Sequence, residues 1–422
     1  MTNNFNKYFF VFFSTLPLSI IAGPTVSLIN LFLLIISYCY IFFDQQHYKL
    51  FKNNIVLRLL IFIYLYLIFN SIISIKYEIG IIRNLGFIRL VLLFILINYF
   101  FYIYPKNYKI FNIWSVIIII FVLDVYLERF SGTNIFGWGA VEINGIPQPS
   151  GNRVVSFFKD EPIAGAYLNA FIFLISGYLL SQLKNKQLGI VIFFSIILGL
   201  FFSVVITGER SNSIKAAICL ILFIGFLDFI KVKYKIIILT ILVCSISLVI
   251  INSDYLKNRY LGQMYSEVFV EKKSNFFEKN IYMKLYKSGF NVFKNYPVFG
   301  VGNKNYRVES CKNKEDIIKF DYQCTSHPHQ IYIELLAEHG IVGTLILLSI
   351  FFFLIFKNLK IIILSKNYAQ IGCLLYLLIN FTPLIPSGSF FSDFNITLFF
   401  INLSLLYALN KKTNIFFVEK KL

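Results

Sequence analysis

The segment SHPHQIYIELLAEHGIVG, residues 326–343, joins a long polar stretch to an apolar run. It holds three of the chain's four histidines, His327, His329 and His339. Ionisable side chains next to a membrane-length apolar helix usually mark a functional site. This junction is therefore predicted to be the catalytic edge of an integral membrane protein.

The composition around this junction places the chain in a lipid bilayer. Of its 422 residues, 58% are hydrophobic and only 14% are charged. Apolar runs of about the 18 residues that a membrane helix needs recur along it. The predicted class is all-α, a polytopic membrane protein with about twelve transmembrane helices. The predicted spans are 9–22, 25–43, 55–75, 85–103, 112–127, 163–181, 188–206, 213–230, 236–252, 331–356, 367–384 and 393–409.

Charge distribution predicts the orientation. The formal net charge of +18 lies mostly in short lysine clusters between apolar runs, which is the positive-inside pattern and argues against nucleic-acid binding. With both termini inside, every inner loop is basic. The lysines of these loops are Lys49, Lys52, Lys106, Lys109, Lys184, Lys186, Lys231, Lys233, Lys235, Lys357, Lys360, Lys366, Lys411, Lys412, Lys420 and Lys421. The polar segments 128–162 and 253–330 then lie outside, and the length of the second indicates a functional element.

Cysteine placement agrees with this topology. Four cysteines lie inside apolar spans, where they behave as small hydrophobic residues; they are Cys39, Cys219, Cys244 and Cys373. Cys311 and Cys324 share the second outer segment and are predicted to form a disulfide in an oxidising compartment. A zinc site that adds His327 and His329 is the alternative, and the lack of CxxC spacing disfavours it.

Arginine is scarce beside lysine, so each outer arginine is a candidate for bidentate binding of an anionic, phosphate-bearing ligand. The candidates are Arg83, Arg129, Arg153, Arg210, Arg259 and Arg307. The alternative is that some pair with neighbouring carboxylates such as Glu128 and Glu209, or are solvated.

Three polar motifs open helices that run from outside to inside. They are KDEP at 159–162, TGERSN at 207–212, with Ser211 or Asn212 as a cap, and SHPH at 326–329. Helix N-termini attract anions, so these ends are predicted to form a pyrophosphate cradle with the arginines. His329 is placed in the first turn of its helix, where the dipole keeps the imidazole neutral, as a general base requires.

Several segments together resemble the O-antigen ligase and O-antigen polymerase superfamily over roughly residues 150–392. They are RVVSFFKDEPIAGAYL (153–168), TGERSNSIKA (207–216), FNVFKNYPVFGVGNKNYR (290–307), Cys311 with Cys324, HPHQIYIELLAEHGIVG (327–343) and PSGSFF (386–391). The resemblance implies a GT-C-like, metal-independent, inverting glycosyltransferase without a cofactor. Such enzymes move a glycan from undecaprenyl diphosphate to an acceptor hydroxyl on the periplasmic face of the bacterial inner membrane.

The resemblance also implies roles for individual residues. The family's His-Asn-x-Tyr pattern falls on HQIY (329–332), and its Glu-x-Gly pattern on EHG (338–340). Its essential arginine falls on Arg210, and the second, in the large loop, is assigned to Arg307, with Lys284 or Lys287 as alternatives. The predicted catalytic residues are His329, Arg210 and Arg307, and the predicted substrate-binding residues are Arg153, Glu161, Glu209, His327, Tyr332 and Glu338.

The acceptor is the open point of this interpretation. A ligase would use lipid A-core, which is favoured; a polymerase would use another lipid-linked glycan; a third group transfers to protein. The predicted organisation is N-terminal helices at 1–127, the catalytic membrane region at 128–409 with the large loop 253–330, and a cytoplasmic tail at 410–422. A flippase or transporter would bury charges in mid-helix and show related halves, and a scaffold would need no such cluster of motifs.

Overall fold

The computed structural model describes residues 2–37, 54–105, 107–139, 153–159, 161–183, 187–265 and 280–417. Across these residues the regular secondary structure is helical, without strands, which confirms the all-α class. Several residues named above lie outside the described ones: Cys39, Lys49, Lys52, Lys106, Lys184, Lys186, Lys420 and Lys421.

The helices follow the predicted apolar runs. The N-terminal part contains α1 (Thr2–Ser14), α2 (Leu16–Ile21), α3 (Pro24–Ile36), α5 (Ile55–Ile72), α6 (Tyr77–Gly86), α7 (Ile88–Ile103) and α8 (Lys109–Ser131). The middle part contains η2 (Ser156–Phe158), α9 (Ala164–Leu183), α10 (Gln187–Ile206), α11 (Arg210–Gly225), α12 (Val232–Asn252), α13 (Asp254–Lys257), η3 (Asn258–Gly262) and α14 (Gln263–Tyr265). The C-terminal part contains α16 (Ile281–Asn295), α17 (Tyr306–Ser310), α18 (Lys314–Phe320), α19 (Ile331–Phe356), α20 (Leu359–Ser365), α21 (Tyr368–Ile379) and α22 (Asp393–Ala408).

Seven helical segments among the described residues are long and apolar enough to cross a membrane. They are Ile55–Ile72, Tyr77–Ile103, Lys109–Ser131, Ala164–Leu183, Leu188–Ile206, Val232–Asn252 and Ile331–Ser365. Three shorter apolar helices are Pro24–Ile36, Tyr368–Ile379 and Asp393–Ala408. Every predicted span overlaps a helix, and the count of about twelve crossings stays a prediction.

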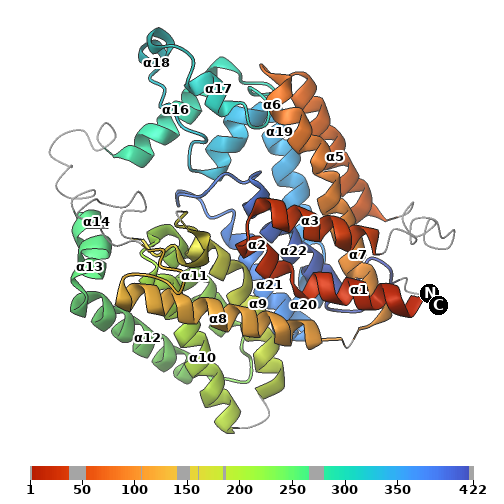
Figure 1. Cartoon of the computed structure of the whole chain (residues 1–422), viewed down its shortest axis with the longest axis vertical. Coiled ribbons are helices and arrows are strands. Elements are labelled where there is room, and N and C mark those ends of the chain that lie inside the picture. The colour runs from red at the N-terminus through yellow and green to blue at the C-terminus, as the bar shows by residue number, and fades with distance from the viewer. Residues whose placement is uncertain are drawn as a thin grey trace.

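The centre of the molecule is formed by α9, α21 and α22, between α10–α12 on one side and α5 and α7 on the other (Figure 1). Helix α9 packs against α21, and α22 packs against α7. The contact of α9 with α21 is close because glycines face the opposing backbone: a Cβ on Gly177 would lie 2.1 Å from the Tyr368 carbonyl oxygen. This central group fixes where the outer ends of the helices meet.

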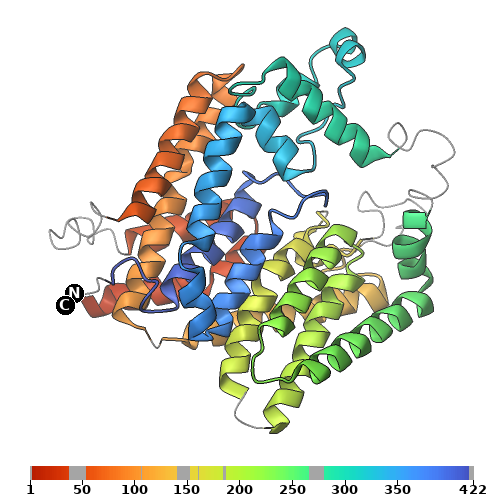
Figure 2. The same cartoon turned by 180° about the vertical axis from the view of Figure 1, so that it is seen from behind.

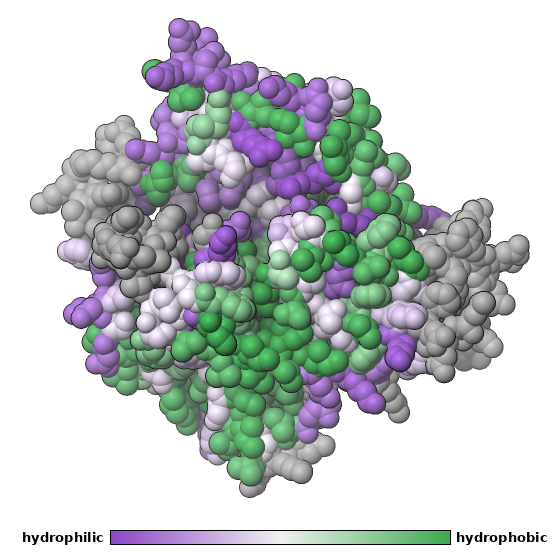
Figure 3. Space-filling view, viewed as in Figure 1, coloured by the Kyte–Doolittle hydropathy of each residue, from purple (hydrophilic) through white to green (hydrophobic). Residues whose placement is uncertain are grey.

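The segment that follows α14 builds a polar cap. Helices α16, α17 and α18 lie together at one end of the molecule, next to α6 and the start of α19 (Figures 1 and 2). Hydrophilic residues gather over this end, whereas the opposite end of the same face is hydrophobic (Figure 3). Helix α16 packs on α19, so tightly that a Cβ on Gly289 would meet the Ile333 side chain at 2.4 Å.

Helix α19 is broken at Gly340, whose φ of 61° and ψ of −170° are not helical. The polar cap pairs with the backbone groups that the break leaves free. The amides of Val301 and Gly302 donate to the carbonyls of Ala337 (3.0 Å) and Glu338 (2.9 Å), and those of Ile341 and Val342 donate to Pro297 (2.8 Å) and Val298 (3.2 Å). The predicted span 331–356 has the same bounds as α19, and the break at Gly340 was not predicted.

We expect Gly340→Ala to destabilise the protein. Its positive φ costs an L-residue about 1–3 kcal/mol, and a Cβ there would lie 2.3 Å from the Val298 carbonyl. The measurement is thermal unfolding of the purified protein in detergent. The control is Gly199→Ala in α10, where a Cβ meets nothing within 4 Å. Equal melting temperatures for the two variants would contradict the expectation.

Candidate active site

A cavity of about 660 Å³ opens between the starts of α9, α11, α19 and α22 and the end of α21. Its volume is typical of a pocket for a small molecule or one end of a larger ligand. Six of the predicted site residues line it, namely Arg153, Glu161, Glu209, Arg307, His327 and His329. It thus collects residues from segments far apart in the sequence.

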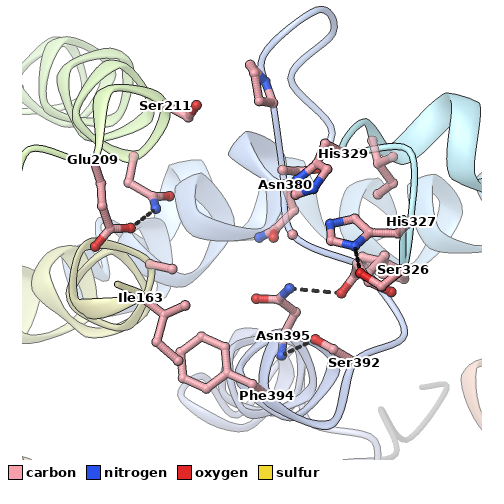
Figure 4. Close-up of a pocket in the computed structure, with 18 of the residues that line it drawn as sticks. Ile163, Glu209, Ser211, Ser326, His327, His329, Asn380, Ser392, Phe394 and Asn395 are labelled. Carbon is pink, nitrogen blue, oxygen red and sulfur yellow. Dashed lines mark hydrogen bonds between the residues drawn. The ribbon is translucent and has the colours of Figure 1, made fainter. Parts of the chain in front are cut away.

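The two histidines form one side of the cavity (Figure 4). Their rings lie 3.9 Å apart, centre to centre, and the Ser326 hydroxyl lies 2.9 Å from Nδ1 of His327. Burial, followed by the charge of Lys304, lowers the pKa of His327 to about 4. Burial, followed by the charge of His327, lowers the pKa of His329 to about 4. Both imidazoles are therefore neutral near pH 7.

The prediction that His329 lies in the first turn of its helix is wrong. Helix α19 begins at Ile331, and the side chain of Gln330 caps it by accepting from the Ile333 amide at 2.9 Å. His329 precedes this cap with a left-handed backbone, φ 57°. Burial, rather than the helix dipole, keeps its ring neutral.

Glu209 lies on the opposite side of the cavity (Figure 4). One of its carboxylate oxygens accepts from the Gly165 amide and the other from the Asn212 side chain, both at 2.6 Å. Burial raises the pKa of Glu209 to about 7, although Gly165, Asn212 and Arg153 act to lower it. Glu209 therefore caps the start of α9 from another part of the chain.

This arrangement corrects the predicted cradle of three helix ends. Glu209 occupies the start of α9, and Gln330 occupies the start of α19. Helix α11 begins at Arg210 with Glu209 as its N-cap residue, so Ser211 and Asn212 lie inside the helix and do not cap it. The start of α11 has no side-chain cap, so of the three predicted ends it alone keeps its main-chain amides for an anion, beside the side-chain cations of the cavity.

The candidate arginines divide into two groups. Arg83, Arg153 and Arg307 line the cavity, and Arg83 pairs with Asp393 at 3.1 Å. By contrast, Arg129 donates to the Ile206 carbonyl at 2.9 Å, and Arg259 donates to the Gly208 carbonyl at 3.1 Å. These two hold the turn that precedes α11.

Arg210 is not among the cavity-lining residues, although its neighbours Glu209, Ser211 and Asn212 are. Burial, followed by the charges of Arg210 and then Arg153, lowers the pKa of Arg259. The three guanidinium groups therefore lie close enough to repel one another. A bound anion would relieve that repulsion.

Lys304 is a cavity residue that sequence reasoning missed. Its ammonium donates to the Ser389 hydroxyl and lies 3.8 Å from Glu334, while Ser389 in turn donates to Glu334. The same carboxylate accepts from the Phe390 amide at 3.0 Å. The sequence feature that could have identified Lys304 is its position in GVGNKNYR (300–307), between the turn glycines and Arg307. Lys304 has a positive φ of 65°, because this turn must follow the break in α19.

Two other predicted residues, Glu338 and Tyr332, lie outside the cavity lining, as does His339. Glu338 is buried, with one oxygen 3.4 Å from the Tyr306 amide, and the Tyr332 hydroxyl donates to the Phe381 carbonyl at 2.6 Å. His339 is buried beside Tyr66. Their contacts are those of residues that hold helices together.

Cys311 and Cys324 form a disulfide. It joins the end of α17 to the non-helical segment between α18 and α19, which contains Ser326 and the histidine pair. Because a disulfide restricts the chain between its cysteines, it limits the positions open to this segment.

The described structure is that of a helical membrane protein in which the ends of several helices enclose a cationic cavity. A family model described as O-antigen ligase matches residues 193–348, from α10 into α19. This match confirms the resemblance to the O-antigen ligase and polymerase superfamily. It supports a function of the O-antigen ligase or polymerase type for this part of the chain. No curated protein matches the chain at a significant level.

The low pKa of the paired histidines is directly testable. Labelling histidine with ¹⁵N in lipid nanodiscs, and assigning the signals with His327→Gln and His329→Gln, would give the protonation state of each ring. We expect both rings to be neutral at pH 6, because burial opposes the imidazolium. A free histidine is about half protonated near pH 6.5, so titration of either ring there would contradict the description of this site.

Proposed function

We propose that this protein is a metal-independent, inverting glycosyltransferase of the bacterial inner membrane. It moves a glycan from undecaprenyl diphosphate to an acceptor hydroxyl on the periplasmic face. The supporting observation is the shared cavity, in which Arg153 and Arg307 accompany a pair of neutral histidines. The disulfide Cys311–Cys324 fits an oxidising compartment for this end of the molecule.

The arginines bind the donor diphosphate in this proposal. Arg153 and Arg307 line the cavity, and Arg210 adds positive charge at its edge. As the bond from the anomeric carbon to the diphosphate oxygen breaks, negative charge grows on the diphosphate, and fixed cations stabilise it. A neutralised diphosphate leaves without protonation, so the leaving group needs neither an acid nor a metal ion.

His329 accepts the proton of the acceptor hydroxyl. A general base must be unprotonated before the reaction, and the lowered pKa of His329 meets that condition. The nearby anionic diphosphate raises the basicity of the ring once the donor is bound. Attack by the deprotonating hydroxyl on the face opposite the diphosphate inverts the anomeric carbon. The tilted ring of His327, 3.9 Å away between ring centres, and the near-perpendicular ring of Tyr282 hold His329 in place.

The acceptor proposed is lipid A-core, in keeping with the description of the matching family as O-antigen ligase. A polymerase of the same superfamily would carry the same donor chemistry and use another lipid-linked glycan as acceptor. Acceptors differ in shape and are recognised by variable loops, whereas the cavity described above concerns the donor.

Point variants test the catalytic roles in a deletion strain. We expect His329→Ala and Arg307→Ala to reduce glycan attachment by about 100-fold or more, since each removes a group that acts in the transition state. The measurement is the lipopolysaccharide banding pattern, with exposed Lys314→Met as the control. Bare core with glycan accumulating on the carrier indicates a ligase, and core bearing a single repeat indicates a polymerase. A normal ladder with both variants would refute the assignment.

The pH dependence tests the base independently. For purified enzyme and lipid-linked donor, we expect kcat/KM to fall on the acid side with a midpoint near pH 4, the pKa of free His329. The acid limb of kcat should lie at higher pH, because the bound diphosphate raises that pKa. A limb near pH 7 that disappears in Glu209→Gln would come from Glu209. A kcat/KM midpoint of about 6.5, the ordinary histidine value, would contradict the proposal.

A further inference from the structure

Lys215 is a buried cation in the wall of the same cavity. Its residue is only 8% exposed, in the second turn of α11, and it lines the cavity. Within the described part of the chain, no hydrogen bond or ion pair engages its ammonium group, and the buried thiol of Cys219 lies one turn further along the helix. A buried charge without a partner is costly, so a bound anion would stabilise it.

The residues around Lys215 are amides. Asn212 precedes it by three residues and therefore shares its face of α11. Asn169 of α9 donates to the Asn212 main-chain carbonyl at 3.0 Å, while its own side-chain oxygen is buried and has no partner among the described residues. Asn380 follows α21, and its side chain lies between the Glu209 side and the histidine side (Figure 4). All three asparagines line the cavity with Lys215.

An unpaired cation beside an unpaired acceptor defines the ligand chemistry. The ammonium of Lys215 requires an anion, and the side-chain oxygen of Asn169 requires a donor. The proposed function assigns the donor diphosphate to Arg153 and Arg307, so the anion at Lys215 is a second one. A sugar acid carries a carboxylate and hydroxyl donors close together, and it satisfies both Lys215 and Asn169.

We propose that Lys215, Asn169, Asn212 and Asn380 form a subsite for a carboxylate-bearing sugar of the transferred glycan. The carboxylate binds Lys215, a neighbouring hydroxyl donates to Asn169, and the other amides bind further hydroxyls. This inference rests on the proposed transferase function and adds a substrate class to it. It makes Lys215 a specificity-determining residue, because a neutral sugar would leave its ammonium unpaired.

The test compares two donors that differ only in the carboxylate. The first is the lipid-linked glycan isolated from the host strain, and the second is the same material with its carboxylates reduced to primary alcohols. We expect wild-type enzyme to prefer the first by about 10- to 100-fold in kcat/KM, the effect of one buried charged hydrogen bond. Lys215→Met should lose this preference, because it has no ammonium to pair with the carboxylate.

Control variants separate the possible failures. Lys215→Gln is a second neutral variant in case the Met variant is unstable, Lys215→Arg should retain the preference, and Lys314→Met removes an exposed charge outside the cavity. Equal losses on both donors would place a carrier phosphate at Lys215 and overturn the proposal. An unchanged preference in Lys215→Met would also overturn the proposal, as would the finding that the host glycan contains no acidic sugar. If wild type transfers neither donor, the proposed function itself fails.

Discussion

The main-chain hydrogen bonds at the break in α19 are the interaction on which the site depends. A helix interruption within an apolar protein leaves amides and carbonyls that lipid cannot satisfy, so it persists only where other protein groups pair with them. The turn around Gly300 and Gly302 supplies those groups to residues 337–342. The same turn is tied to the N-terminal helices, because the Asn303 amide donates to the side chain of Asn70 at 2.7 Å and its side chain donates to Asn84 at 2.5 Å. Lys304 and Arg307 follow directly, and their positions in the cavity are set by this anchorage.

The carboxylates of the site act mainly within the protein. Glu209 is held by the start of α9 and by Asn212, and Glu334 is held by Ser389, the Phe390 amide and Lys304. Each buried acid thus has its hydrogen bonds satisfied internally. Glu209 therefore neutralises the cations of the cavity less than its charge alone suggests, whereas Arg83 and Lys304 are paired with Asp393 and Glu334. Because these carboxylates are held by hydrogen bonds within the protein, one cavity can contain Glu, Arg and neutral His side chains.

The sequence predicted the helical class and the general position of the site better than its local geometry. Apolar runs give helices directly, and the histidines at residues 327 and 329 marked the junction because ionisable groups are rare beside membrane helices. The break at Gly340 was not predicted, since hydropathy and periodicity carry no signal about a single φ value. Lys215 and Lys304 were missed for another reason. Lys215 lies within a predicted span and Lys304 within the long polar segment, and only tertiary packing shows that both face the cavity.

The cluster of Arg129, Arg153, Arg210 and Arg259 raises the question of how like charges are tolerated before a substrate binds. The carbonyl groups at the end of α10 provide the answer, because a helix C-terminus carries partial negative charge and unpaired acceptors. Arg129 donates to Ile206, Arg259 donates to Gly208, and the Tyr260 hydroxyl donates to Val205. The Val154 amide, next to Arg153, donates to Thr207 at 2.9 Å. Backbone carbonyls thus stabilise the guanidinium groups of Arg129 and Arg259. Arg129 and Arg153 also interact with the carboxylates of Glu128 and Glu209. A diphosphate that enters the cavity then meets cations already held in place, so less side-chain entropy is lost on binding.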